Sequence, residues 1–155
     1  MPDETRGRRP DAVLFCCNFN QVRSPMAEAL LKHFAGDRIF VDSCGLRRAV
    51  FDPDEDEMEV DPLAAEVMAQ IGLDLTRHRS KTFDELDDES FDLVISLTPE
   101  AQHRAVELAR GRAAEIEYWP TMDPTLAEGS RAHRLEVYRQ VRDSLAARIA
   151  DRFGS

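Results

Sequence analysis

A cysteine, an arginine and a serine are spaced so that they could act together on phosphorus. Cys17 precedes Arg23 by six positions, and Ser24 follows directly. A thiol needs positive surroundings to become a thiolate, and a guanidinium can bind two phosphate oxygens while the thiolate attacks phosphorus. The spacing predicts a phosphate-binding loop, Cys17-Asn18-Phe19-Asn20-Gln21-Val22-Arg23-Ser24, in which Cys17 and Arg23 are catalytic.

A cysteine six positions before an arginine also arises by chance, so the elements around the loop carry the argument. The apolar run 12–16 predicts a strand that ends at the loop, and residues 25–34 have helical spacing with Pro25 near the helix start. This order directs backbone N–H groups and the positive end of the helix to one point beyond the strand. The context favours a phosphate loop.

The rest of the chain alternates between strand and helix patterns. The expected strands are residues 39–43, 91–97 and 116–119, and the expected helices are residues 61–71, 100–110 and 131–153. This alternation predicts an α/β fold: a doubly wound four-stranded parallel sheet with helices on both faces and the phosphate loop after the first strand.

Composition predicts one cytoplasmic domain. The chain has 155 residues, 43% of them hydrophobic, which suits a single core. Residues 1–10 are expected to form a flexible polar tail without a signal-peptide core, and residues 11–155 a single domain. The net charge of -10 disfavours nucleic acid and anionic membranes as partners, and no apolar stretch is long enough to span a membrane.

Three cysteines cannot all pair, and two of them are adjacent, which argues against a secreted disulfide framework. Cys16 and Cys44 suit the role of small buried apolar residues better than a chemical one.

Beyond the loop itself, motifs along nearly the whole chain after residue 11 resemble the low-molecular-weight protein tyrosine phosphatase family. The family loop runs Cys-x-Gly-Asn-x-Cys-Arg-Ser and continues with Pro-Met-Ala-Glu. The matching residues are Cys17, Asn20, Arg23, Ser24, Pro25, Met26, Ala27 and Glu28, followed by Ser43-x-Gly45, Asp61-Pro62-x-Ala64, Gly72, His78-x-Ser80, Asp92-Leu93-Val94-Ile95, Trp119-Pro120 and Asp123-Pro124.

The resemblance implies a role for each residue of the loop. Cys17 would be the nucleophile of a phosphocysteine intermediate, and Ser24 would donate a hydrogen bond to its thiolate. Asp123, fixed by Pro124, would protonate the leaving group and then activate water. A turn residue is the alternative reading of Asp123. Substrate binding is expected of Arg23 and of the remaining loop residues, which are Asn18, Phe19, Asn20, Gln21, Val22 and Ser24.

Asn20, Ser43 and His78 match the hydrogen-bond network that supports the family's loop; a surface or helix-end histidine is the alternative interpretation of His78. No metal and no cofactor is expected, because phosphoryl transfer through cysteine needs neither. The acidic run from Asp52 to Glu59 is interpreted as a solvated loop.

The loop also departs from the family pattern. Phe19 replaces a glycine, which predicts either strain or a changed loop, and Val22 replaces the second cysteine that protects the nucleophile as a disulfide. Asn18 and Gln21 replace apolar residues of the pocket, and Thr125 replaces a tyrosine. These changes weaken phosphotyrosine as the particular substrate.

The expected function is a phosphatase for phosphotyrosine on protein or a small phosphate monoester, acting as a monomer or weak dimer. Phosphoarginine is an alternative substrate. Thioredoxin-coupled arsenate reductases share this fold but use two further cysteines, and residues 65–155 contain none, so only a reductase that relies on an external thiol stays open. A weakly active oxyanion-binding module is the remaining alternative, although pure binding would need neither Cys17 nor Asp123.

Overall fold

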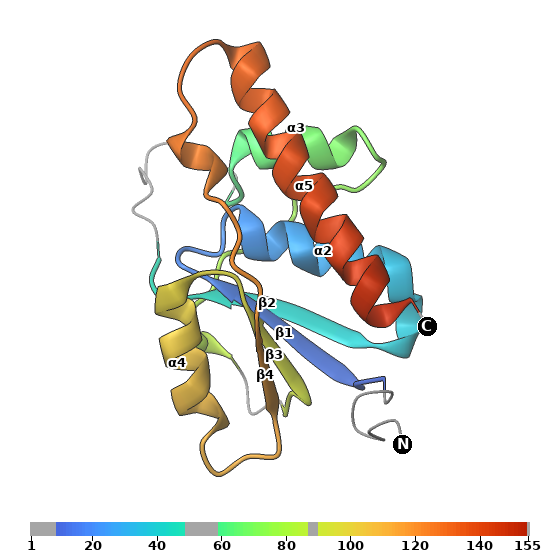
Figure 1. Ribbon diagram of the computed structural model, residues 1–155, viewed down its shortest axis with the longest axis vertical. Coiled ribbons are helices and arrows are strands. Elements are labelled where there is room, and N and C mark those ends of the chain that lie inside the picture. Colours follow the sequence, from blue (N-terminus) through green and yellow to red (C-terminus); the bar gives the residue numbers. More distant parts are fainter. Residues whose placement is uncertain (1–8, 49–58, 87–89, 155) are drawn as a thin grey trace.

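The computed structural model describes residues 9–48, 59–86 and 90–154. Its centre is a sheet of four parallel strands, in the order β2-β1-β3-β4 (Figure 1). The strands are β1 (Ala12–Cys17), β2 (Phe40–Gly45), β3 (Leu93–Ser96) and β4 (Glu115–Tyr118). The predicted four-stranded parallel sheet is therefore confirmed.

Helices cover both faces of this sheet (Figure 1). They are α2 (Arg23–Ala35), α3 (Pro62–Ala69), α4 (Pro99–Ala109) and α5 (Arg131–Phe153). Successive side chains of β1 alternate between the faces, so Val13, Phe15 and Cys17 pack in the core formed with α2, α3 and α5. Leu14 and Cys16 pack in the second core, which includes residues of α4. Both sets are buried, as expected of a central parallel strand.

Three of the four helices begin at a capping side chain. Asp61 caps α3 and Thr98 caps α4, and each is followed by a proline at the first helical position. Ser130 caps α5. No side chain among the described residues caps α2, whose N-cap residue is Val22. The first backbone N–H groups of α2 thus lie beside the loop that follows β1, where an anion could accept their hydrogen bonds.

The observed elements agree with the sequence expectations to within two or three residues at each end. The helix predicted at 25–34 begins earlier, at Arg23, which places Pro25 within its first turn. Residues 1–8 of the predicted tail lie outside the described residues, as do residues 49–58. Within the described part of the chain, no helix has the length and apolar character needed to cross a membrane.

Candidate active site

Cys17 is the last residue of β1, a strand with a neighbour on each side, and Arg23 is the first residue of α2. The residues between them turn the chain from the carboxyl end of the sheet into the helix. The Cys17 side chain is almost fully buried, with 3% of its surface exposed, and its Sγ lies 2.9 Å from Ser24 Oγ. Because a thiolate can only accept, Ser24 would be the donor in the reactive form of this pair.

Asn20 holds the loop in shape through its side chain. It is the one non-glycine residue with positive φ in the described chain, at 57°, a conformation that asparagine tolerates better than most residues. Its Nδ2 donates to Ser24 Oγ at 2.8 Å and to Ser43 Oγ at 2.9 Å, and its Oδ1 accepts from the backbone N–H of Lys81 at 3.0 Å. Asn20 thus joins the loop to α2, to β2 and to the segment after α3.

The backbone carbonyl of Asn20 has two further partners. Ser80 Oγ donates to it at 3.0 Å, and Nε2 of His78 lies 2.9 Å away. His78 is only partly exposed and lies against the loop, so it is not simply a surface histidine. The structure therefore brings Asn20, Ser43 and His78 together, from three separate segments of the chain.

Ser43 is fixed from the other side by α2. Its hydroxyl donates to Glu28 Oε1, and Glu28 also forms an ion pair with Lys32 one turn later. The lone pairs of Ser43 Oγ then remain available to Asn20 Nδ2. Glu28 is the last residue of the Pro-Met-Ala-Glu motif, and its contact with Ser43 explains why a carboxylate suits this position.

Gly45, at the end of β2, lies in close contact with the backbone of the loop. A Cβ atom at this position would lie 2.7 Å from the nitrogen of Asn20, 2.8 Å from the carbonyl carbon of Phe19 and 3.0 Å from the carbonyl oxygen of Asn18. That same Asn18 oxygen accepts the N–H of Leu46 at 2.8 Å. The absence of a side chain at Gly45 thus allows the loop to pack directly on β2.

Thr98, which lies between β3 and α4, also supports the loop, and nothing in the sequence signalled this role. Its hydroxyl donates to Asn18 Oδ1 at 2.8 Å while accepting the N–H of Ala101 at 3.1 Å as the cap of α4. The side chain of Asn18 is therefore bonded to a buried threonine behind the loop. Asp61 is a second such support, because its N–H donates to the carbonyl of Gln21 at 2.9 Å.

A pocket of about 70 Å³ opens beside Cys17. Of the residues predicted to bind substrate, Phe19, Gln21 and Val22 line it, whereas Asn18, Asn20 and Ser24 make the hydrogen bonds described above. Arg23, Asp123 and Thr125 complete its wall. The small volume suits a compact tetrahedral group, since cofactor and drug-sized sites usually need several hundred Å³.

Arg23 and Asp123 face each other across this pocket. Arg23 Nη1 donates to the carbonyl of Thr121 at 3.0 Å, and Nη2 lies 3.8 Å from Asp123 Oδ2. The other oxygen of Asp123 accepts from the N–H of Thr125 at 3.0 Å and from its hydroxyl at 2.6 Å. Asp123 is thus a turn residue by its hydrogen bonds and a pocket residue by its position, so the two readings are compatible.

The backbone strain predicted for Phe19, which stands where the family has a glycine, is not observed. It does not have a positive φ, so the backbone there requires no glycine. Its ring is 43% exposed, lines the pocket, and has the guanidinium of Arg47 6.0 Å from its centroid. The phenyl ring therefore points away from the tight contact between the loop and Gly45.

Cys16 and Cys44 lie in the core on the opposite face of the sheet from Cys17. Both are fully buried and neither forms a disulfide. Burial raises the pKa of both thiols well above the ordinary value, and neighbouring cysteines add to this effect. They remain protonated core residues.

No group of three or more histidine, cysteine or acidic side chains that could hold a metal ion occurs among the described residues. Most of the acidic run, residues 52–58, lies outside that part of the chain. Glu59 forms ion pairs with Arg48 and Arg79.

The Cys17 thiol at the end of β1, the loop that leads into α2, and the side chains of Arg23 and Asp123 thus surround one small pocket. Residues 12–151 match the model of the family described as low molecular weight phosphotyrosine protein phosphatase. The chain belongs to this family.

Relatives and solved structures agree with this assignment. An arsenate reductase of Halalkalibacterium halodurans is 33% identical over 137 residues, which span 88% of this chain and 91% of that protein. The low molecular weight protein tyrosine phosphatase of T. tengcongensis is 26% identical, with a TM-score of 0.69 over 89% of this chain and 94% of that one. The tyrosine phosphatase AmsI of Erwinia amylovora shares the fold, with a TM-score of 0.72 at 20% identity over 96% and 94% of the two chains.

Proposed function

We propose that this protein is a metal-independent cysteine phosphatase that hydrolyses phosphate monoesters, with phosphotyrosine on protein as its substrate. One observation carries the proposal: the pocket beside the Cys17 thiol is also lined by Arg23 and Asp123. A nucleophile, an anion-binding group and a candidate acid around one small volume are what two-step phosphoryl transfer through cysteine requires.

In the first step the Cys17 thiolate attacks phosphorus, and the bond to the leaving oxygen breaks. Ser24 Oγ, 2.9 Å from Sγ, stabilises the thiolate by donating a hydrogen bond. Arg23 leaves its bond to the Thr121 carbonyl and binds two phosphate oxygens, while the N–H groups of the loop bind the others. Asp123 gives its proton to the leaving oxygen.

In the second step water attacks the phosphocysteine. Asp123, now a carboxylate, takes a proton from this water, the sulfur–phosphorus bond breaks, and the thiolate and inorganic phosphate are restored. The bonds from Thr125 hold the carboxylate of Asp123 at the pocket wall through both steps. Arg23, which lies 3.8 Å from the other carboxylate oxygen, keeps the phosphate on the same side.

The proposed preference for an aryl ester rests on Phe19. Its half-exposed ring offers a flat apolar wall beside Cys17, although Gln21 and Thr125 are polar. Aromatic pairs gain about 0.5–1.5 kcal/mol beyond the area that they bury, which corresponds to roughly a threefold to tenfold preference. Phosphoarginine, whose planar group could also lie on this ring, is the competing substrate.

The test is phosphate release from a phosphotyrosine peptide and from para-nitrophenyl phosphate, with a chelator present. Cys17→Ser should be inactive, whereas Cys44→Ser should retain activity because Cys44 lies in the opposite core. Asp123→Asn should lower kcat by about 10² or more on the peptide, whose leaving group needs a proton, and less on the activated ester. The exposed Asp37→Asn is its control. A fully active Cys17→Ser would refute the mechanism.

A second experiment addresses the substrate. Phe19→Ala should lower kcat/KM for the phosphotyrosine peptide by about threefold to tenfold and leave that for phosphoserine and glycerol phosphate nearly unchanged. An equal loss on aryl and alkyl esters would show that Phe19 shapes the loop without selecting the ester. If the wild type hydrolyses phosphoarginine faster than phosphotyrosine, phosphoarginine replaces phosphotyrosine as the proposed substrate.

Partners and compartment follow as part of the proposal. The partner is a phosphorylated protein or small monoester, and the net charge of -10 argues against nucleic acid or an anionic membrane. The free thiols of Cys16, Cys17 and Cys44 support a reducing compartment, the cytoplasm. A monomer or weak dimer is expected, which the sedimentation of the purified protein would test.

Arsenate reduction is a second candidate function, because the 33% identical relative is named an arsenate reductase. Cys17 would attack arsenate with loss of hydroxide, and an external thiol would then attack the Cys17 sulfur. The sulfur–arsenic bond breaks, arsenic(V) leaves as arsenite with the bonding electrons, and a mixed disulfide forms that a second external thiol reduces. Arsenite formation with glutathione or glutaredoxin, lost in Cys17→Ser, would support this candidate.

A further inference from the structure

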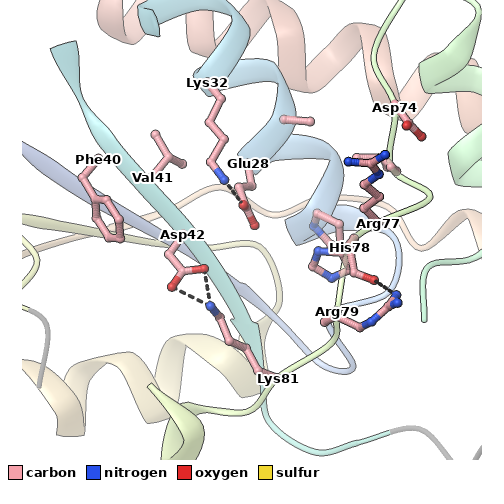
Figure 2. A pocket seen from close by; sticks show the side chains of 13 residues that line it. Glu28, Lys32, Phe40, Val41, Asp42, Asp74, Arg77, His78, Arg79 and Lys81 are labelled. Atoms are coloured by element: carbon pink, nitrogen blue, oxygen red, sulfur yellow. Dashed lines mark hydrogen bonds and ion pairs between the residues drawn. The ribbon is translucent and has the colours of Figure 1, made fainter. Parts of the chain in front are cut away.

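A second hollow lies behind the phosphate loop, on the edge of the sheet. It has a volume of about 570 Å³ and is bounded on one wall by α2 and β2 and on the other by residues 74–81 (Figure 2). We call it the edge groove. Ala29, Val41 and Leu75 supply apolar surface to it, while Lys32 from the first wall and Arg77 from the second are charged. Its volume falls within the range of small-molecule sites.

Basic side chains predominate in the edge groove. They are Lys32, Arg77, His78, Arg79 and Lys81, against the acidic Glu28, Asp42 and Asp74. Figure 2 shows Glu28 paired with Lys32, and Asp42 paired with Lys81. Counted without histidine, as in the 30 acidic and 20 basic residues of the whole chain, the groove is lined by four basic and three acidic side chains, and Arg79 is also paired with Glu59. The groove thus has a small excess of basic side chains on an acidic protein.

Residues of the edge groove hold Asn20 together with Ser24 and Ser80, which do not line it. The Asn20 carbonyl lies 2.9 Å from His78 Nε2, and Asn20 Oδ1 accepts the N–H of Lys81. Asn20 Nδ2 donates to Ser43, whose hydroxyl donates to Glu28. The residue that gives the phosphate loop its shape is therefore supported from this groove.

The two walls of the edge groove differ in regularity. Residues 74–81 contain no helix or strand, and the N–H of Gly45 binds the carbonyl of Lys81 at the end of that segment. The facing wall, formed by α2 and β2, belongs to the core of the domain. A molecule that bound cations of both walls would cross-link the irregular segment to the regular elements, and would thereby restrict its motion.

We propose that the edge groove is a second binding site, for a small polyanion with acidic groups on a short carbon skeleton, and that its occupant activates catalysis at Cys17. One acidic group binds Lys32 and another binds Arg77, while the skeleton lies on the apolar surface between them. The occupant holds residues 74–81 against α2, which fixes the partners of Asn20 and the loop that carries Cys17. The proposal of activation rests on the proposed phosphatase function.

The experiment uses citrate and methylenebisphosphonate as probes, since neither is a phosphate ester that the enzyme could hydrolyse. Each is titrated at constant ionic strength into the wild type during hydrolysis of para-nitrophenyl phosphate. We expect a saturable rise in kcat of about twofold or more, because a firmer loop acts on the chemical step. The two probes distinguish a carboxylate from a phosphate-like ligand. If neither probe raises kcat, the proposal is wrong. It is also wrong if the probes only raise KM, as competitors of the substrate would.

A double variant localises the effect. Lys32→Gln with Arg77→Gln removes one cation from each wall and should raise the half-saturating probe concentration about tenfold or more, since each removes a charge-assisted hydrogen bond. Arg110→Gln with Arg112→Gln, exposed after α4, makes the same change of charge and should respond as the wild type does. An equal response of both double variants would overturn the proposal.

A readout without turnover separates this proposal from the proposed function. Binding of inorganic phosphate to the wild type, measured by calorimetry, should become about twofold tighter with citrate bound in the edge groove, and this gain should vanish in the Lys32→Gln, Arg77→Gln variant. If the chain hydrolyses no phosphate ester but shows this coupling, the proposed function fails and the edge groove stands. If citrate leaves the affinity for inorganic phosphate unchanged, the coupling is refuted whatever the activity.

Discussion

Gly45→Ala offers the sharpest test of how the phosphate loop is held. The added Cβ would lie 2.7 Å from the nitrogen of Asn20, whereas ordinary contacts begin at 3.4 Å. The loop must therefore recede by about 0.7 Å, and its neighbours here are backbone atoms that cannot rotate away. The φ of Gly45 is not in the left-handed region, so crowding is the whole effect.

The expected loss is large in activity and moderate in stability. A misplacement approaching 1 Å in a catalytic loop can lower kcat/KM by about 10²-fold. Overpacking costs about 1–3 kcal/mol, which would lower Tm by roughly 2–12 °C for a domain of this size. The assays are hydrolysis of para-nitrophenyl phosphate and thermal unfolding followed by circular dichroism.

Gly111→Ala is the matched control. Gly111 has a φ of 75° and no heavy atom within 4 Å of the position that a Cβ would take, so it introduces conformational strain without crowding. It should cost about 1 kcal/mol of stability and leave kcat/KM unchanged. If folded Gly45→Ala retained kcat/KM within about threefold of the wild type, the loop would not rest on β2 and the reasoning would be refuted.

Three further predictions concern the supports and the anion-binding group. Tyr138 donates to Asp61 at 3.0 Å, and burial, with the charge of Asp61, raises the pKa of its hydroxyl; Tyr138→Phe should cost about 1 kcal/mol near neutral pH. The raised pKa of Tyr138 contributes stability that is fully present below its ordinary pKa of about 10 and is lost as the pH rises further. In urea unfolding, the free energy of unfolding of the wild type should therefore fall above pH 10, and it should fall less in Tyr138→Phe. Thr98→Val removes the cap of α4 and the partner of Asn18, and should cost about 2 kcal/mol, or roughly 4–8 °C in Tm. Arg23→Lys keeps the charge but loses the two-pronged geometry, so kcat/KM should fall by about 10²-fold in steady-state assays, and a smaller loss than tenfold would contradict its assigned role.

The fold could be predicted from the sequence because local patterns determine it. The apolar run of β1, the helical spacing after it and the prolines at the helix starts each act within about ten residues. The nearness of Cys17 to Arg23 follows from the same local order. These features do not depend on which strands are neighbours.

The supports of the loop could be predicted only in part, because they come from distant segments. Only the resemblance to the family predicted that Ser43 and His78 support the loop. Local patterns could not, because the distance of these residues from Asn20 depends on strand order and on the path of the chain after α3. Thr98 had no signal of its own, because a threonine before a proline predicts a helix cap and says nothing of Asn18. The contact of Gly45 follows from the register that pairs it with Cys17.

The positions of the three thiols bear on the choice between hydrolysis and reduction. A reductase with an internal relay needs a second thiol that can reach the Cys17 sulfur. Cys16 and Cys44 lie on the opposite face of the sheet, are fully buried and are held protonated, and Val22 occupies the loop position at which the family often has a cysteine. The electrons for arsenate would thus have to enter through the 70 Å³ pocket from an external thiol. Hydrolysis needs only water at the same place, and Asp123, the base of the proposed mechanism, lines that pocket.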